Sequence, residues 1–201
     1  MIDCAFNSLL NREYDITYWI LRAINTLIDF SYCDQKILGI VKNSKITLLL
    51  QRIFKGNQSQ QSLLLEVGLE FIYKALQFQS QEIRFFFLTF LNDIKDLIDT
   101  KVQNSLLVMC SFVLVILCEQ VDQQESGDII SLQFKILQYL NEQNLIDEVI
   151  ETLQNTWNML DENIYNLNSR QQQLLEILAE SKNEAISEIA INMMCIQNSI
   201  S

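Results

Sequence analysis

Apolar residues return along the chain at steps of three and four positions, the period of an α-helix with one buried face. Three such stripes are Ile16, Ile20, Ala23, Ile24 and Leu27; Ile46, Leu49, Leu50 and Ile53; and Leu65, Leu69, Ile72 and Leu76. Polar clusters separate the apolar segments, at 11–15, 31–35, 42–45, 55–61, 79–82, 100–105, 121–128, 141–144, 161–168 and 180–184. The pattern therefore predicts amphipathic helices joined by short polar turns. The expected N-caps are Asp15, Ser44, Ser105, Asp128 and Ser181.

One stretch, at 106–118, reads LLVMCSFVLVILC and is interrupted only by Ser111. A membrane-spanning helix needs about 20 apolar residues, and polar residues flank this shorter stretch on both sides. A short helix that is apolar all round is typical of a buried position. We expect it to be the central, fully buried helix of an all-helical fold with no membrane contact.

Composition narrows the fold and the chemistry. The chain has no proline, no histidine and only four glycines, and 49% of its residues are hydrophobic, which disfavours turn-rich β folds and glycine-rich nucleotide loops. Histidine is the commonest general base and metal ligand. Its absence predicts a non-enzyme without a cofactor, a metal site or a small-molecule substrate.

The formal net charge of -11 disfavours direct binding to nucleic acid, which requires a basic face, and favours a basic protein or peptide partner. Residues 1–60 hold 7 Lys or Arg and 5 Asp or Glu, whereas 61–201 hold 7 and 20. Carboxylates recur at helical spacing near the C-terminus, at Asp147, Glu148, Glu151, Glu176, Glu180, Glu184 and Glu188. This face is either simply solvated or meets a cationic partner.

The five cysteines are scattered and lack a CxxC spacing. They are Cys4, Cys33, Cys110, Cys118 and Cys195. We expect them to be small buried residues of a protein in a reducing compartment, the cytoplasm or the nucleus.

Segment 34–77 resembles one armadillo repeat, with a short first helix at 34–41, a second at 45–54 and a long third at 61–77. Residues 22–27, within LRAINTL, lie over 67–72 at an offset of 45, with a small residue at the second position of each. Stacked helical repeats use such small residues for close approach. The resemblance implies a right-handed armadillo/HEAT-like superhelix. It would be a single domain over 1–201, with repeats at about 1–33, 34–79 and 80–122 and helical hairpins over 123–201.

The nearest relatives in that family would be the importin-alpha adaptors, in which a tryptophan and an asparagine of each third helix hold an extended basic peptide. Those repeated tryptophan and asparagine residues form the family's peptide-binding ladder. Arg22 and Thr26 occupy their positions in one repeat here, and Val67 and Phe71 in the next, so the ladder is absent. Trp19 lies one turn before Arg22 and Ala23. It is either a core residue or a surface residue that stacks on a lysine side chain. The candidate partner-binding residues are Trp19, Arg22, Thr26, Glu66, Glu70 and Phe71.

The resemblance thus implies a non-catalytic adaptor that binds a basic peptide or protein cargo for nuclear import. The missing ladder favours an alternative, a structural helical subunit of a larger assembly whose faces are permanently covered.

Overall fold

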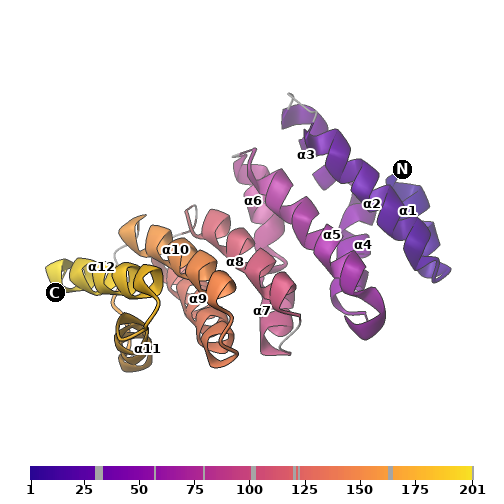
Figure 1. Ribbon diagram of the computed structural model, residues 1–201. Coiled ribbons are helices and arrows are strands. Elements are labelled where there is room, and N and C mark those ends of the chain that lie inside the picture. The colour runs from indigo at the N-terminus through magenta and orange to yellow at the C-terminus, as the bar shows by residue number, and fades with distance from the viewer. Residues whose placement is uncertain are drawn as a thin grey trace. The chain divides into compact units, whose positions relative to one another are not determined.

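The computed structural model describes residues 1–29, 34–56, 58–78, 80–100, 103–119, 121, 123–162 and 165–200. Over these residues the chain forms α-helices and no β-strand, which confirms the predicted all-α class (Figure 1). The helices are α1 (Ile2–Leu10), α2 (Tyr14–Asp29), α3 (Asp34–Val41), α4 (Ser44–Phe54), α5 (Gln58–Leu76), α6 (Gln81–Leu88), α7 (Leu91–Asp99), α8 (Asn104–Cys118), α9 (Gln123–Glu142), α10 (Ile146–Glu162), α11 (Ser169–Ala179) and α12 (Glu184–Ile200).

The helix boundaries follow the polar clusters closely except at Thr89 and Phe90, where α6 and α7 are separated without a polar cluster. Helices α3, α4 and α5 match the short, medium and long helices expected within 34–77, and α6, α7 and α8 repeat that order of lengths. The expected N-caps are wrong: Asp15, Ser44 and Ser105 lie in the first turns of α2, α4 and α8, and asparagines cap α4 and α12. The side chain of Asn43 accepts a hydrogen bond from the Lys45 amide at 3.0 Å, and Asn183 accepts from the first amides of α12. Asp128 lies well inside α9.

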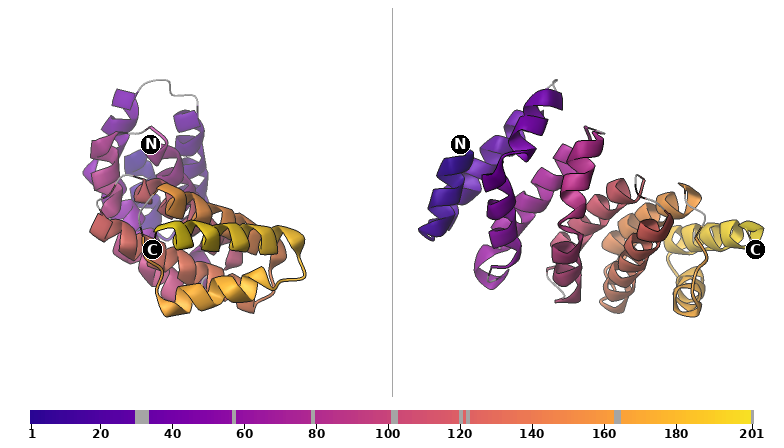
Figure 2. Two further views of the ribbon diagram at one scale, coloured as in Figure 1. Left: turned by 90° about the vertical axis from the view of Figure 1, so that its left-hand side faces the viewer. Right: turned by 180° about the vertical axis from the view of Figure 1, so that it is seen from behind.

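The chain divides into two compact units, Met1–Val113 and Leu114–Ser201, with the boundary inside α8. This boundary coincides with none of the expected repeat boundaries. In the first unit α2 packs along α1 and α5, and α4 contacts α1, α3, α5 and α7. In the second unit α10 packs against α9 and α12, and α11 packs along α12, an order that can be followed in Figure 2.

Helix α8 carries the long apolar stretch. Leu107, Cys110 and Val113 are buried, whereas Met109, Phe112 and Ile116 are partly exposed, so the expectation of burial on every side is only partly correct. None of the described helices has the length and apolar character that crossing a membrane demands.

The buried face of α2 differs from the expected stripe. Thr17, Leu21, Ile24, Asn25 and Ile28 are buried. Ile16, Ala23 and Leu27, which the apolar period assigned to the core, are exposed. Helix α2 has apolar residues on two sides, and its packing against α1 and α5 decides which side is covered.

The cysteines fall into two groups. Cys110 and Cys118 are buried as expected, and burial raises the pKa of the Cys110 thiol to about 12. Cys4 and Cys195 are exposed, so the expectation of burial is wrong for them, while Cys33 lies outside the described residues.

Candidate functional site

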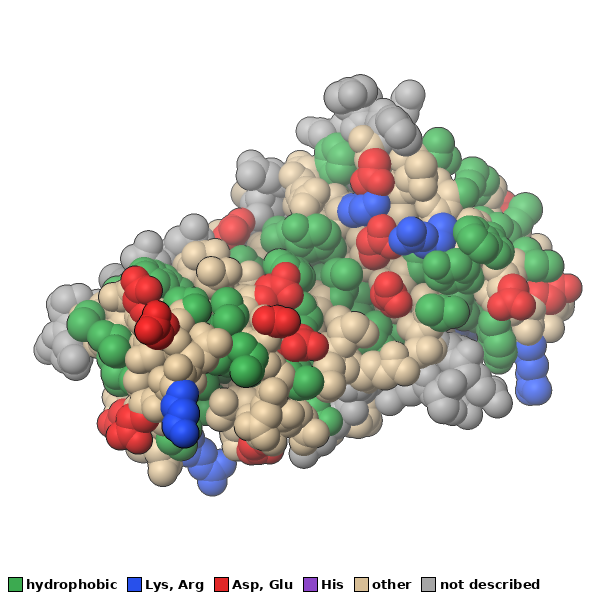
Figure 3. All heavy atoms as spheres, in the orientation of Figure 1, with side chains coloured by type: hydrophobic (Ala, Val, Ile, Leu, Met, Phe, Trp, Pro, Cys, Tyr) green, Lys and Arg blue, Asp and Glu red, His purple; other side chains and the backbone are tan. Residues whose placement is uncertain are grey.

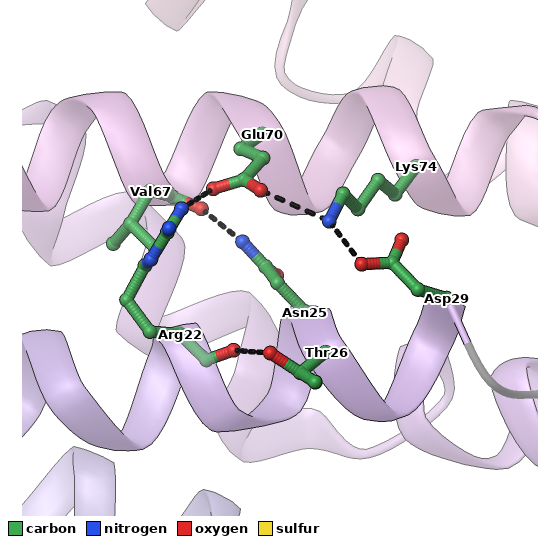
Figure 4. A network of polar contacts seen from close by, with 7 residues as sticks. All are labelled: Arg22, Asn25, Thr26, Asp29, Val67, Glu70 and Lys74. Atoms are coloured by element: carbon green, nitrogen blue, oxygen red, sulfur yellow. Dashed lines mark hydrogen bonds and ion pairs between the residues drawn. The ribbon is translucent and has the colours of Figure 1, made fainter.

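The six candidate residues derive from α2 and α5, which lie side by side in the first unit. Arg22 of α2 contacts Glu70 of α5, and Asp29, two turns further along α2, contacts Lys74, one turn further along α5 (Figure 4). The two helices therefore run in the same direction. This places the exposed residues of both on one continuous surface.

Four charged side chains connect the two helices in a chain of alternating sign. A guanidinium nitrogen of Arg22 lies 2.6 Å from one Glu70 oxygen, and Lys74 Nζ lies 3.0 Å from the other. Lys74 also donates to Asp29 at 2.6 Å. The network has two positive and two negative members, so each of its charges already has a partner within the protein.

The pKa values of these groups reflect their contacts. Burial alone would raise the pKa of Glu70, but Lys74, Asn25 and Arg22 outweigh it and lower the pKa below the ordinary value of 4.5. Burial would lower the pKa of Lys74, but Asp29 and Glu70 raise it above 10.5. Glu70 therefore stays ionised at neutral pH as the shared partner of two cations.

Asn25 is a buried polar residue that the sequence reasoning missed. Its Nδ2 donates a hydrogen bond to the backbone carbonyl of Val67 at 3.1 Å, across the interface between α2 and α5. Its Oδ1 has no partner among the described residues. The sequence signal that could have identified Asn25 was its spacing from Leu21 and Ile28, which places all three residues on one face of α2.

The structure separates the six candidates. Trp19 has 68% of its surface exposed, so its interpretation as a core residue is wrong. Glu66 is exposed as well, while Arg22 and Glu70 bind each other. Thr26 Oγ1 donates to the Arg22 carbonyl of its own helix at 2.9 Å.

Phe71 does not reach this surface. It is fully buried and packs edge to face against Phe87, with ring centroids 6.1 Å apart. Its position on the core side of α5 removes it from the candidate partner-binding residues.

The exposed side of α2 is apolar. Ile16, Trp19 and Leu27 are 50%, 68% and 53% exposed, and Ala23 lies between them at helical spacing. We call these four residues the α2 face. Figure 3 shows hydrophobic side chains gathered beside basic and acidic ones over α2 and α5. Soluble proteins seldom leave a contiguous apolar patch uncovered unless it binds something.

The charges around the α2 face are mainly negative once the paired groups are set aside. Three exposed carboxylates have no ion-pair partner in the described part of the chain: Glu13, Asp15 and Glu66. Arg12 is an exposed cation that likewise has no ion-pair partner there. No cluster of potential metal ligands occurs among the described residues. The surface thus combines an aromatic anchor, aliphatic side chains and carboxylates, which suits contact with a protein.

Comparison with known proteins identifies no relative of this chain. The sequence matches no protein-family model, no curated protein and no solved structure.

Proposed function

We propose that this protein is a non-catalytic interaction module that binds a basic, amphipathic segment of a partner protein on the α2 face. The observation that carries the proposal is the 68% exposure of Trp19 between Ile16 and Leu27. Tryptophan is strongly enriched among the residues that dominate the energy of protein interfaces. Its indole gains most from an aliphatic or cationic side chain placed against the ring.

The charge around the α2 face supports a basic partner. Arg22 and Lys74 are already paired with Glu70 and Asp29. Their positive charges are therefore not available to bind the carboxylates of an acidic partner. Glu13, Asp15 and Glu66 are available to attract lysine or arginine.

The finer parts of the proposal are an armadillo-like stacking of the helices and the transport of basic cargo into the nucleus. Their support is the repeated order of short, medium and long helices in α3–α5 and α6–α8, together with the sequence resemblance. At the positions of the family's peptide-binding ladder, Arg22 is held in an ion pair with Glu70, and Val67 and Phe71 are buried, so binding on the α2 face would differ from the family's mode.

Fluorescence anisotropy of a labelled amphipathic peptide, with lysines on one face and leucines on the other, tests the proposal. A peptide with glutamate in place of lysine is the control. We expect micromolar binding of the basic peptide that weakens as salt increases. Trp19→Ala should weaken it about tenfold or more.

Phe85→Ala is the matched control, because Phe85 is an equally exposed aromatic residue of α6, at 70%. It should leave the affinity unchanged, and neither variant should alter the thermal melt, since both side chains are exposed. Equal affinity of Trp19→Ala and the parent protein, or no binding of the basic peptide at about 100 μM, would contradict the proposal.

The structural-subunit alternative has an observation of its own. Among the exposed large hydrophobic residues of the described chain, five lie in the first 27 positions: Met1, Leu10, Ile16, Trp19 and Leu27. A permanent subunit contact would cover such a concentration. Light scattering of the purified chain distinguishes the two functions. An obligate oligomer that Trp19→Ala disrupts would support the structural subunit. A stable monomer would support the interaction module.

A further inference from the structure

The second unit contains a groove between α9 and α11. Two adjoining hollows of about 370 Å³ and about 140 Å³ share Gln138, Arg170 and Leu174 in their walls. The larger hollow is in the size range of small-ligand and peptide sites, about 300–1,000 Å³. The two therefore form one elongated groove rather than separate pits.

Hydrogen bonds fix the two walls of the groove relative to each other at one end. The Tyr165 hydroxyl lies 3.2 Å from Ser131 Oγ on α9 and accepts from Gln171 Nε2 on α11 at 3.3 Å. Gln171 and Asn168 form a capping box that locks the start of α11. A groove held open in this way loses little entropy when it binds a ligand.

The lining combines an apolar floor with amide side chains. Phe134 and Leu174 are 4% and 8% exposed, and Ile177 projects at 53% exposure at the edge of the larger hollow. Gln138 and Gln173 stand on opposite walls. An amide side chain both donates and accepts, which matches the alternating donors and acceptors of an extended peptide backbone.

The charge of the groove is opposite to that of its surroundings. The second unit has 14 Asp or Glu but only three cations, Lys135, Arg170 and Lys182, and the first two of these line the groove. Arg170 has no ion-pair partner within the described residues. Among the described lining residues the carboxylate is Glu142, which accepts a hydrogen bond from Gln138 at 2.8 Å.

We propose that this groove binds a short, extended, acidic segment of a partner protein, with Arg170 pairing with an Asp or Glu and an aliphatic side chain covering Leu174 and Ile177. A guanidinium forms two parallel hydrogen bonds with a carboxylate, which gives both strength and orientation. The site is distinct from the α2 face, and it selects a ligand of opposite charge.

The test is anisotropy of a labelled octapeptide in which Asp and Glu alternate with Leu, using the full chain. We expect saturable binding with a dissociation constant of about 1–100 μM. Arg170→Gln should weaken it about 10- to 100-fold, and Arg170→Lys should recover part of the loss. A peptide with Asn and Gln in place of Asp and Glu should bind as weakly as the acidic peptide binds to Arg170→Gln.

Lys182→Gln is the matched control, because it removes one positive charge from the same unit outside the groove. Its affinity should equal that of the parent protein, as should that of Trp19→Ala. Circular dichroism melts check that Arg170→Gln folds, which is expected since the Arg170 side chain is exposed and its amide stays capped by Asn168. Equal losses in Lys182→Gln and Arg170→Gln, or no binding at about 1 mM, would overturn the proposal.

Discussion

The Glu70 carboxylate is the residue through which α2 and α5 are most directly joined. It accepts hydrogen bonds from Arg22 and Lys74, and only 19% of its side chain is exposed to solvent. A partly buried ion pair with two cations resists solvent screening better than an exposed pair does. The contribution of this network to stability therefore depends on the ionisation of Glu70.

Replacing Glu70→Gln is expected to lower the free energy of unfolding by about 1 kcal/mol at neutral pH, because both cations lose their shared countercharge. The folded-state pKa of Glu70 is lowered from 4.5. Its stabilisation is thus fully present above that value and is lost as the pH falls through the lower folded pKa. Urea unfolding from pH 7 downward should show the difference between variant and parent shrinking below pH 4.5.

Glu66→Gln provides the control, since it makes the same chemical change one turn earlier on an exposed position. It should change stability by no more than about 0.5 kcal/mol. A loss for Glu70→Gln that matches Glu66→Gln, or that persists unchanged into acid, would show that the network contributes nothing measurable.

At the scale of the element, α2 and α8 show what hydrophobic pattern can and cannot predict. The period of three and four correctly predicts that 14–29 is helical. It does not predict which of two apolar stripes is buried, because neighbours far away in sequence cover Thr17 and Asn25 and leave Ile16 and Leu27 in solvent. In α8 nearly every position is apolar, so composition predicts a largely buried helix but does not predict that Phe112 is partly exposed.

Replacing Val113→Asp in α8 should cost several kcal/mol out of a total of about 5–15 kcal/mol, because Val113 is fully buried and the new carboxylate would have no partner. Thermal melts followed by circular dichroism would detect a large fall in the melting temperature or loss of the cooperative transition. Ser105→Asp is the control on the same helix, since Ser105 is exposed in the first turn, where a negative charge is favourable. A normal melt for Val113→Asp would disprove the core assignment of α8.

At the scale of the whole molecule, the net charge is confined to one unit. The first unit holds 11 Lys or Arg and 11 Asp or Glu, and ion pairs such as Arg22–Glu70 and Lys74–Asp29 join them. The second unit holds 3 and 14. Its carboxylates, including Glu184 and Glu188 one turn apart, repel one another at neutral pH.

Added sodium chloride should therefore raise the melting temperature at pH 7 between about 10 and 200 mM, because screening relieves this repulsion more than it weakens exposed ion pairs. Differential scanning calorimetry gives the measurement. Near the sequence pI of 4.4 the effect should shrink, since the net charge is then close to zero. A melting temperature that falls with salt at pH 7 would mean that ion pairs outweigh the repulsion.

The candidate site could be predicted from sequence only in part. Arg22 and Glu70 were both recognised as polar residues on third helices, but 48 positions separate them, and no local pattern shows that they bind each other. Phe71 was assigned to the wrong side, and Trp19 was left open between core and surface, for the same reason, since exposure depends on which helices pack alongside. The groove between α9 and α11 has no sequence signal, because its lining comes from two helices whose spacing is set by Tyr165 and Gln171.

The hydrogen bond from Asn25 to the Val67 carbonyl has a consequence for evolution. Asn25 donates to the backbone of α5 and not to a side chain, so the hydrogen bond does not depend on the chemistry of the buried side chain at position 67. Arg22 and Glu70 depend on each other's chemistry, so a change at one selects for a compensating change at the other. Among diverged descendants of this sequence, positions 22 and 70 would covary, whereas Asn25 would persist without covarying with position 67.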